Sequence, residues 1–135
     1  MTDLDAVLTA NHAFYQAFAL RDPDAMDRLW AREAAVSCIH PGWPPLLDRA
    51  VIMGSWRNIL HAPSALAMHC GGSQGRVYGT TALVLCEEIM EETVFAATNL
   101  FVLEQGQWRM VHHQATPIAV PTARPASPPR PQHLH

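Results

Sequence analysis

Helical periodicity dominates the N-terminal half of the chain. Apolar side chains recur every three or four residues between positions 3 and 20, which predicts a long amphipathic helix. In the stretch "RDPDAMDRLWA", Asp22 suits an N-cap and Pro23 the first helical position, so a short second helix should begin there. Asp48 can cap a third helix in the same way. The pattern therefore predicts three helices.

After Pro63 the pattern changes to that of β-strands. A short strand, "AAVSCIHP", already precedes the third helix and ends at Pro41. The later β-rich segments are separated by "GGSQG", "MEE" and "EQGQ", which are typical of hairpin connections, and lie near residues 65–70, 76–90, 93–104 and 107–116. Helices followed by an antiparallel meander predict an α+β fold, with the helices packed on one face of a curved sheet.

The apolar composition indicates one domain with an additional buried surface. Residues 1–117 fit the usual size of a single domain, whereas residues 118–135 form a proline-rich tail that is unsuited to a regular hydrogen-bonded element. Hydrophobic residues make up 49% of the chain and charged residues only 16%. Because so little charge is available to cover the surface, we expect part of it to be buried, most simply in a homodimer.

Charge and apolar run lengths argue against two classes of partner. The net charge is −3, the chain has no lysine, and no basic run could follow a phosphate backbone, so nucleic acid is not an expected partner. No apolar stretch approaches the roughly 18–20 residues that cross a bilayer, and the N-terminus is acidic where a secretory signal would be basic. We therefore expect a cytoplasmic protein that does not bind membranes.

The cysteines and histidines give no pattern of a metal site. Three cysteines without a CxxC pair favour neither a disulfide framework nor a zinc site, so buried free thiols are the default expectation. Within residues 1–117 the histidines lack HxH and HxxxH spacing, and zinc would require His40, Glu87 and a histidine of the last strand to converge. No cofactor motif is visible either, so we expect neither a metal nor a cofactor.

Two adjacent histidines near the end of the last strand must point to opposite faces of the sheet. Side chains alternate along a strand, so His112 and His113 cannot share a role. Each face also carries apolar side chains, such as Met110 on one and Val111 on the other. A sheet covered by helices on one side and by a second subunit on the other would explain this pattern.

Polar residues on the two preceding strands are candidates for a pocket. Asn99 alternates with Ala97 and Phe101, so its amide is either bonded within the protein or aimed at a ligand. Alternation must direct one of Glu87 and Glu88 inward. An inward carboxylate in an apolar cavity would have a raised pKa and could exchange protons near neutrality. The alternatives are a solvated strand end or an ion pair with an arginine.

The segment "HPGW" suggests the mouth of a cavity. His40 lies just before Pro41 at a strand end, from which a side chain can project into a cavity, although a loop histidine satisfied by its neighbours is the alternative. Trp43 and Trp56 are candidates to roof a pocket, or else belong to the core.

Several phrases resemble the nuclear transport factor 2-like superfamily, especially its SnoaL-like branch. The resemblance covers roughly residues 4–117 and rests on "FALRDPDAMDRLWA", "VSCIHPGW", "VIMGSWRNIL" and "ATNLFVLEQGQWRMVHHQA". It implies a cone, in which a strongly curved antiparallel sheet wraps around three N-terminal helices, encloses a pocket and dimerises through its outer face. Because this fold hosts isomerases, dehydratases, cyclases, epoxide hydrolases and noncatalytic association domains, it does not decide the function.

Two members of the superfamily imply where the site lies. The position of the general base of ketosteroid isomerase resembles that of His40, its oxyanion-binding acid that of Asn99, and its catalytic tyrosine that of Phe14. The association domain of calcium/calmodulin-dependent kinase is similar through the last hairpin.

Both comparisons imply the same strand faces. Asn99, His113 and Ala115 would face the pocket, Glu87 would join them by alternation, and His112 would face the dimer partner. The other expected ligand contacts are Tyr15, Trp43, Trp56, Phe101 and Val111.

Two functions from different classes fit these expectations. The first is a cofactorless isomerase or lyase that acts by proton transfer on a small, largely apolar substrate. In it His40 or Glu87 is the general base, Asn99 donates a hydrogen bond to a developing oxyanion, and His113 orients the substrate or shuttles a proton. The second is a noncatalytic dimeric binding or association module, whose pocket residues only satisfy one another. Convergence of the polar side chains around space for a ligand would favour the first.

Overall fold

Three helices form the N-terminal half of the computed structural model, which describes residues 1–62 and 67–119. They are α1 (Asp3–Ala19), α2 (Pro23–Leu29) and α3 (Arg49–His61). The side chains of Thr2, Asp22 and Asp48 cap their N-termini by accepting backbone N–H groups. The three predicted helices are confirmed. The proline-rich tail predicted for residues 118–135 lies almost wholly outside the described residues.

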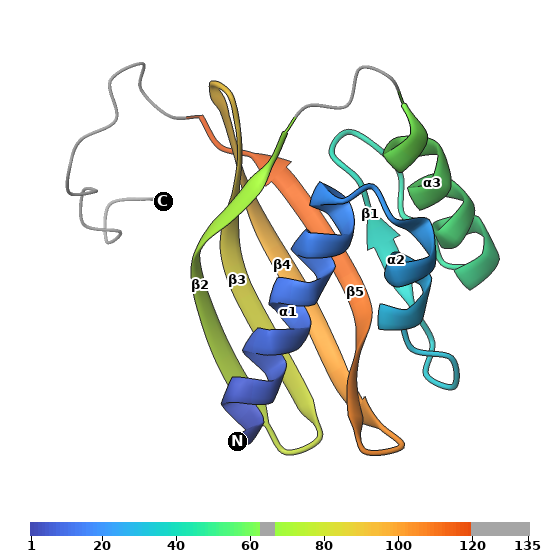
Figure 1. The fold of residues 1–135 in the computed structure, drawn as a ribbon, viewed down its shortest axis with the longest axis vertical. Coiled ribbons are helices and arrows are strands. Elements are labelled where there is room, and N and C mark those ends of the chain that lie inside the picture. Colours follow the sequence, from blue (N-terminus) through green and yellow to red (C-terminus); the bar gives the residue numbers. More distant parts are fainter. Residues whose placement is uncertain (63–66, 120–135) are drawn as a thin grey trace.

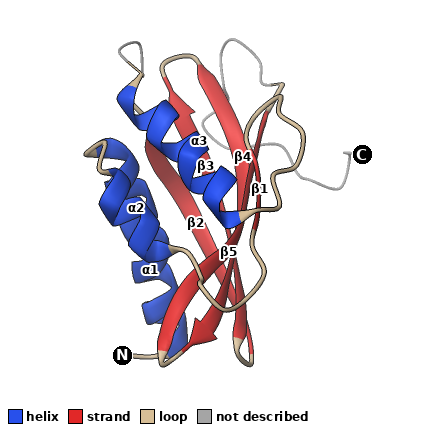
Figure 2. Cartoon of the chain, turned by 90° about the vertical axis from the view of Figure 1, so that its right-hand side faces the viewer, coloured by secondary structure: helices blue, strands red, loops and turns tan. Residues whose placement is uncertain are grey.

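Five strands make one strongly curled, open sheet that the helices cover on one face (Figures 1 and 2). Its order is β1-β5-β4-β3-β2, and all neighbours are antiparallel except the parallel pair β1 and β5. The strands are β1 (Ser37–Ile39), β2 (His69–Tyr78), β3 (Thr81–Met90), β4 (Thr93–Glu104) and β5 (Gln107–Pro117). This arrangement confirms the predicted α+β class, with the parallel pair as an added feature. None of the described helices is long and apolar enough to cross a membrane.

The first hairpin lies elsewhere than predicted. The "GGSQG" segment is not a connection but part of β2, which passes through it with a bulge between Gly71 and Gln74. The turn falls instead at Gly79, whose φ of +64° suits glycine, so the segment predicted as residues 76–90 belongs to two strands. The glycine-rich sequence serves packing: a Cβ at Gly75 would lie 2.7 Å from Cδ1 of Leu4 on α1.

A second bulge changes which side chains of β5 face inward. Leu100 pairs with His112, but the next residue of β4, Phe101, pairs with Met110, so Val111 is the extra residue. On the N-terminal side of the bulge Met110 is therefore the buried residue, with no exposed surface. On the other side His113 and Ala115 face inward, as the strand alternation requires.

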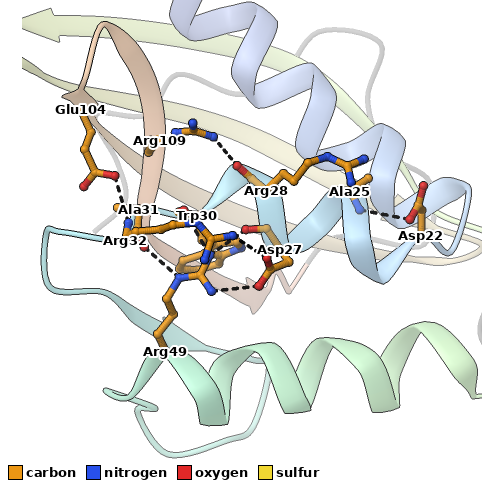
Figure 3. A network of polar contacts seen from close by, with 10 residues as sticks. All are labelled: Asp22, Ala25, Asp27, Arg28, Trp30, Ala31, Arg32, Arg49, Glu104 and Arg109. Carbon is orange, nitrogen blue, oxygen red and sulfur yellow. Dashed lines mark hydrogen bonds and ion pairs between the residues drawn. The ribbon is translucent and has the colours of Figure 1, made fainter.

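The start of α3 is fastened to the end of α2 by one arginine (Figure 3). The Arg49 guanidinium bonds the Asp27 carboxylate at 2.9 Å and the backbone carbonyls of Asp27, Trp30 and Ala31 at 2.7, 3.3 and 2.9 Å. Arg32 binds the other Asp27 oxygen. The fork of the guanidinium suits such multiple contacts, so this clamp fixes the chain where it leaves α2 and approaches β1.

Candidate functional site

A cavity of about 310 Å³ opens between the helices and the inner face of the sheet. Five aromatic side chains line it, namely Phe14 and Phe18 on α1, Trp43 after β1, Trp56 on α3 and Phe95 on β4. Three titratable side chains reach it: His40 after β1, Glu88 on β3 and His113 on β5. Its volume is at the lower end of the range of roughly 300–1,000 Å³ for small-molecule sites. An apolar cavity with a few convergent polar groups is the usual form of a ligand site.

Glu88, not Glu87, is the carboxylate at this cavity. In β3 the buried residues are Ala82, Val84, Cys86 and Glu88, so Glu87 lies on the opposite face. The prediction that Glu87 faces the pocket is wrong. The register shows why, since inward Asn99 pairs with Val84 and inward Phe95 pairs with Glu88, and directly paired residues share a face.

Behind the cavity, Glu88 and His113 are held by a buried hydrogen-bond network. The Tyr15 hydroxyl donates to Oε2 of Glu88 at 2.7 Å. The Asn99 amide donates to the Tyr15 oxygen at 3.1 Å and to Oδ1 of Asn11 at 2.8 Å. Oδ1 of Asn99 lies 2.6 Å from Nδ1 of His113. All five side chains are at most 6% exposed, so each depends on the others for its hydrogen bonds.

This network fixes the tautomer of His113. Tyr15 has one proton and gives it to Glu88, so its oxygen must accept from the Asn99 amide nitrogen. The Asn99 oxygen then accepts from Nδ1–H of His113. Nε2 of the neutral ring is left with a lone pair, 3.7 Å from Oε2 of Glu88, which is beyond hydrogen-bonding distance.

Burial drives the pKa values of these groups toward their neutral forms. It raises the pKa of Glu88 to about 7. It lowers the pKa of His113 to about 3, and the neighbouring His40 and His112 act in the same direction. Burial, followed by the nearby Glu88, raises the pKa of Tyr15, which keeps its proton. The site therefore holds a neutral imidazole and a carboxyl that changes charge near neutral pH.

His40 occupies the mouth of the cavity between two tryptophans. Its ring centroid lies 4.8 Å from that of Trp43 and 4.8 Å from that of Trp56. Ser55 donates to the carbonyl of Ile52, so it accepts from Nε2–H of His40 at 2.8 Å, and Nδ1 carries the lone pair. Burial lowers the pKa of His40 to about 4. Because Trp43 is 44% exposed, it forms the outer edge of the opening.

The structure brings together some of the predicted site residues and separates others. His40, His113, Trp43 and Trp56 line one cavity, and Tyr15 and Asn99 stand behind it as partners of Glu88 and His113. Four expected ligand contacts do not line it, namely Tyr15, Phe101, Val111 and Ala115.

Each of these corrections has a physical reason. Phe101 and Ala115 do face inward but pack deeper in the core, and Val111 is displaced by the β5 bulge. Asn99 is not placed to donate to a substrate oxyanion, because both of its amide contacts go to Asn11 and Tyr15. It instead orients His113.

Two residues were missed that the sequence could have supplied. Counting from the two-residue turn after Met90 pairs Met90 with Thr93 and places Glu88 on the same face as Asn99. Asn11 gave a weaker signal, as a polar residue on the buried face of α1.

Within residues 1–62 and 67–119, no three His, Cys, Asp or Glu side chains are grouped to hold a metal ion. That the protein binds no metal stays a prediction.

Comparisons with known proteins agree with this fold. A structure from Streptomyces avermitilis, provisionally named a dehydratase of the NTF2-like family, is 30% identical and has a TM-score of 0.79, over 87% of this chain and 97% of that one. A structure from Thiobacillus denitrificans, provisionally named a calcium/calmodulin-dependent protein kinase type II association domain, is 32% identical with a TM-score of 0.72, over 82% and 94% of the two chains.

One curated relative is a larger protein than this chain. F-box protein SKIP8 of Arabidopsis thaliana is 24% identical over 117 residues, which are 85% of this chain and 51% of that protein, so the chain spans about half of its length. The sequence profile of the SnoaL-like domain matches residues 7–121, which include all five strands and all three helices apart from the first turn of α1. The chain therefore belongs to the SnoaL-like domain family, and its fold is that of the NTF2-like superfamily.

Proposed function

We propose that this protein is an enzyme that isomerises or dehydrates a small, largely apolar substrate by proton transfer, without a cofactor. The observation that carries the proposal is the pairing of Glu88 and His113, 3.7 Å apart, at the wall of one aromatic cavity. A carboxyl with a pKa near the working pH is suited to take up and return a proton in one reaction cycle.

In this proposal each group has a different role. Ionised Glu88 removes a proton from a substrate carbon, and the same carboxyl, now protonated, delivers it to a second carbon in an isomerisation or to a departing hydroxyl as water in a dehydration. Nε2 of His113 accepts a hydrogen bond from a substrate hydroxyl, because Nδ1–H is held by Asn99. Tyr15 stabilises the ionised Glu88 by its hydrogen bond.

The cavity favours a neutral, ring-shaped substrate. Its walls are aromatic, and burial keeps His40 and His113 uncharged at neutral pH. An anionic substrate would meet no cation among the described residues that line the cavity, and ionised Glu88 would repel it.

Deuterium exchange tests this function without knowledge of the natural substrate. Cyclic ketones that also carry a hydroxyl group for His113 to bind, such as 3-hydroxycyclohexanone, serve as probes in deuterated buffer, and NMR follows deuterium uptake at the carbon next to the carbonyl. We expect the protein to accelerate uptake, Glu88→Gln to abolish the acceleration, and the exposed matched control Glu92→Gln to retain it. Binding of the probes, seen by saturation-transfer NMR, without accelerated exchange would contradict the proposal.

A noncatalytic association module is the second candidate, because one structure about as similar as the dehydratase carries an association-domain name. The mutual hydrogen bonds of Tyr15, Asn99 and His113 also fit it, since they satisfy the buried polar groups without a ligand.

Under either function we propose a homodimer through the outer face of the sheet. A cytoplasmic location stays a prediction.

A further inference from the structure

A cluster of sulfur and hydroxyl groups lies where α1 packs on β2 and β3. Cys70 of β2 pairs with the inward Glu88, and Cys86 is the next inward residue of β3. The two thiols are close enough for each to shift the pKa of the other. Sγ of Cys70 also lies 3.3 Å from Oγ of Ser73, and Sγ of Cys86 lies 3.3 Å from the Tyr15 hydroxyl. The proposed function uses neither cysteine.

The two cysteines differ in access. Cys70 is half-buried and lines a second cavity of about 180 Å³. Cys86 is 6% exposed and lies behind it. A reachable thiol backed by a second one is the arrangement in which the first reacts with an oxidant and the second resolves the product.

The surroundings of the cysteines also give their thiols different pKa values. The neighbouring Cys86 holds the pKa of the Cys70 thiol below its ordinary value, and Ser73 and Asn11 act in the same direction. Cys70 in turn raises the pKa of Cys86. By contrast, burial raises the pKa of Cys38 to about 12, and its side chain has no exposed surface. By both its access and its lowered pKa, Cys70 is therefore the most reactive of the three thiols.

We propose that Cys70 and Cys86 form an oxidation site at which hydrogen peroxide converts the two thiols into a disulfide. The Cys70 thiolate attacks one peroxide oxygen, the O–O bond breaks, and Cys70 becomes a sulfenic acid while the second oxygen leaves as hydroxide and takes up a proton as water. The Cys86 sulfur then attacks the sulfenic sulfur, and its proton leaves with the hydroxyl as a second water. The peroxide gains two electrons, which the two thiols lose.

Forming this bond requires a shift of β2, and the bond would reach the candidate site. The two residues are diagonal rather than direct partners, so β2 must adjust slightly, and the bulge that begins at Gly71 is the place where it can. Disulfide formation alters the contact between Cys86 and the Tyr15 hydroxyl, which donates to Glu88. The oxidation site does not depend on the proposed function.

The test exposes the reduced full chain to hydrogen peroxide, alkylates the remaining thiols after unfolding, and maps peptides by mass spectrometry. We expect a peptide cross-linked between Cys70 and Cys86, with Cys38 left alkylated. Cys70→Ser should slow thiol loss by more than about tenfold, whereas the matched Cys38→Ser should react like the unsubstituted protein. In Cys86→Ser, dimedone should trap a sulfenic acid on Cys70.

Three results would overturn the proposal. They are the survival of all three thiols in the peroxide-treated protein, loss of Cys38 as fast as Cys70, and cross-links between chains instead of within one. The peptide map of the unsubstituted protein decides among them, so the test does not depend on how well a variant folds.

Discussion

Glu88 is a carboxyl buried among aromatic rings, and its titration is tied to folding. Its pKa rises from an ordinary 4.5 to about 7 in the folded chain, so the folded state binds this proton more tightly than the unfolded state does. The stabilisation from the bound proton is complete below pH 4.5 and is lost as the pH rises toward 7.

Replacing Glu88 by glutamine should therefore change the pH dependence of stability. The glutamine amide cannot lose a proton, so the variant escapes the loss of stability that ionisation of Glu88 causes. Between pH 4.5 and 7 the free energy of unfolding of the variant, relative to that of the unsubstituted protein, should therefore rise by about 3 kcal/mol. Urea unfolding at a series of pH values measures this difference. The exposed control Glu92→Gln should leave the curve unchanged, and parallel curves for Glu88→Gln would mean that Glu88 titrates normally.

His40 should make the protein sensitive to acid. Its pKa falls from 6.5 to about 4 on folding, so its contribution is present above pH 6.5 and is lost as the pH falls toward 4. His40→Gln can still donate to Ser55 and should reduce the slope of stability against pH in this range by about 1.4 kcal/mol per unit. The slope comes from urea unfolding, with the exposed His61→Asn as control. An unchanged slope in His40→Gln would refute the buried neutral imidazole.

Elements with local sequence signals could be predicted, whereas those set by strand pairing could not. Asp22 and Asp48 marked helix starts because a capping side chain acts on its own first turn. The β5 bulge at Val111 depends on how β4 pairs with β5, and no local pattern signals it. The face of Glu88 could have been counted from the turn after Met90, but the chosen comparison placed Glu87 inward instead.

The clamp at the start of α3 should contribute to stability out of proportion to its one side chain. Arg49→Ala leaves the carbonyls of Trp30 and Ala31 without this partner, which should cost about 2 kcal/mol in urea unfolding. Arg49→Lys should recover only part of it, because an ammonium cannot fork between these acceptors. The exposed Arg57→Ala on the same helix is the control. Equal effects at both positions would show that Arg49 is not a clamp.

At the scale of the whole molecule, the outer face of the sheet is apolar where a monomer would be expected to be polar. It carries Leu83, Leu85, Leu100 and Val102, of which Leu85 is 45% exposed. We predict that Leu85→Arg converts a dimer into a monomer in sedimentation equilibrium. Leu47→Arg, at a 74% exposed loop position, should leave the dimer intact. A monomeric unsubstituted protein would contradict the proposed interface.

The central claim is that Glu88 is a proton-transferring carboxyl beside a neutral His113, and that the two residues are not a fixed ion pair. NMR titration of the Glu88 side-chain carboxyl carbon together with the His113 ring nitrogens measures both protonation states directly. The account predicts that Glu88 titrates near pH 7 while His113 stays neutral, protonated on Nδ1, to well below pH 5. Titration of Glu88 near 4.5 with His113 protonated on both nitrogens at neutral pH would contradict it.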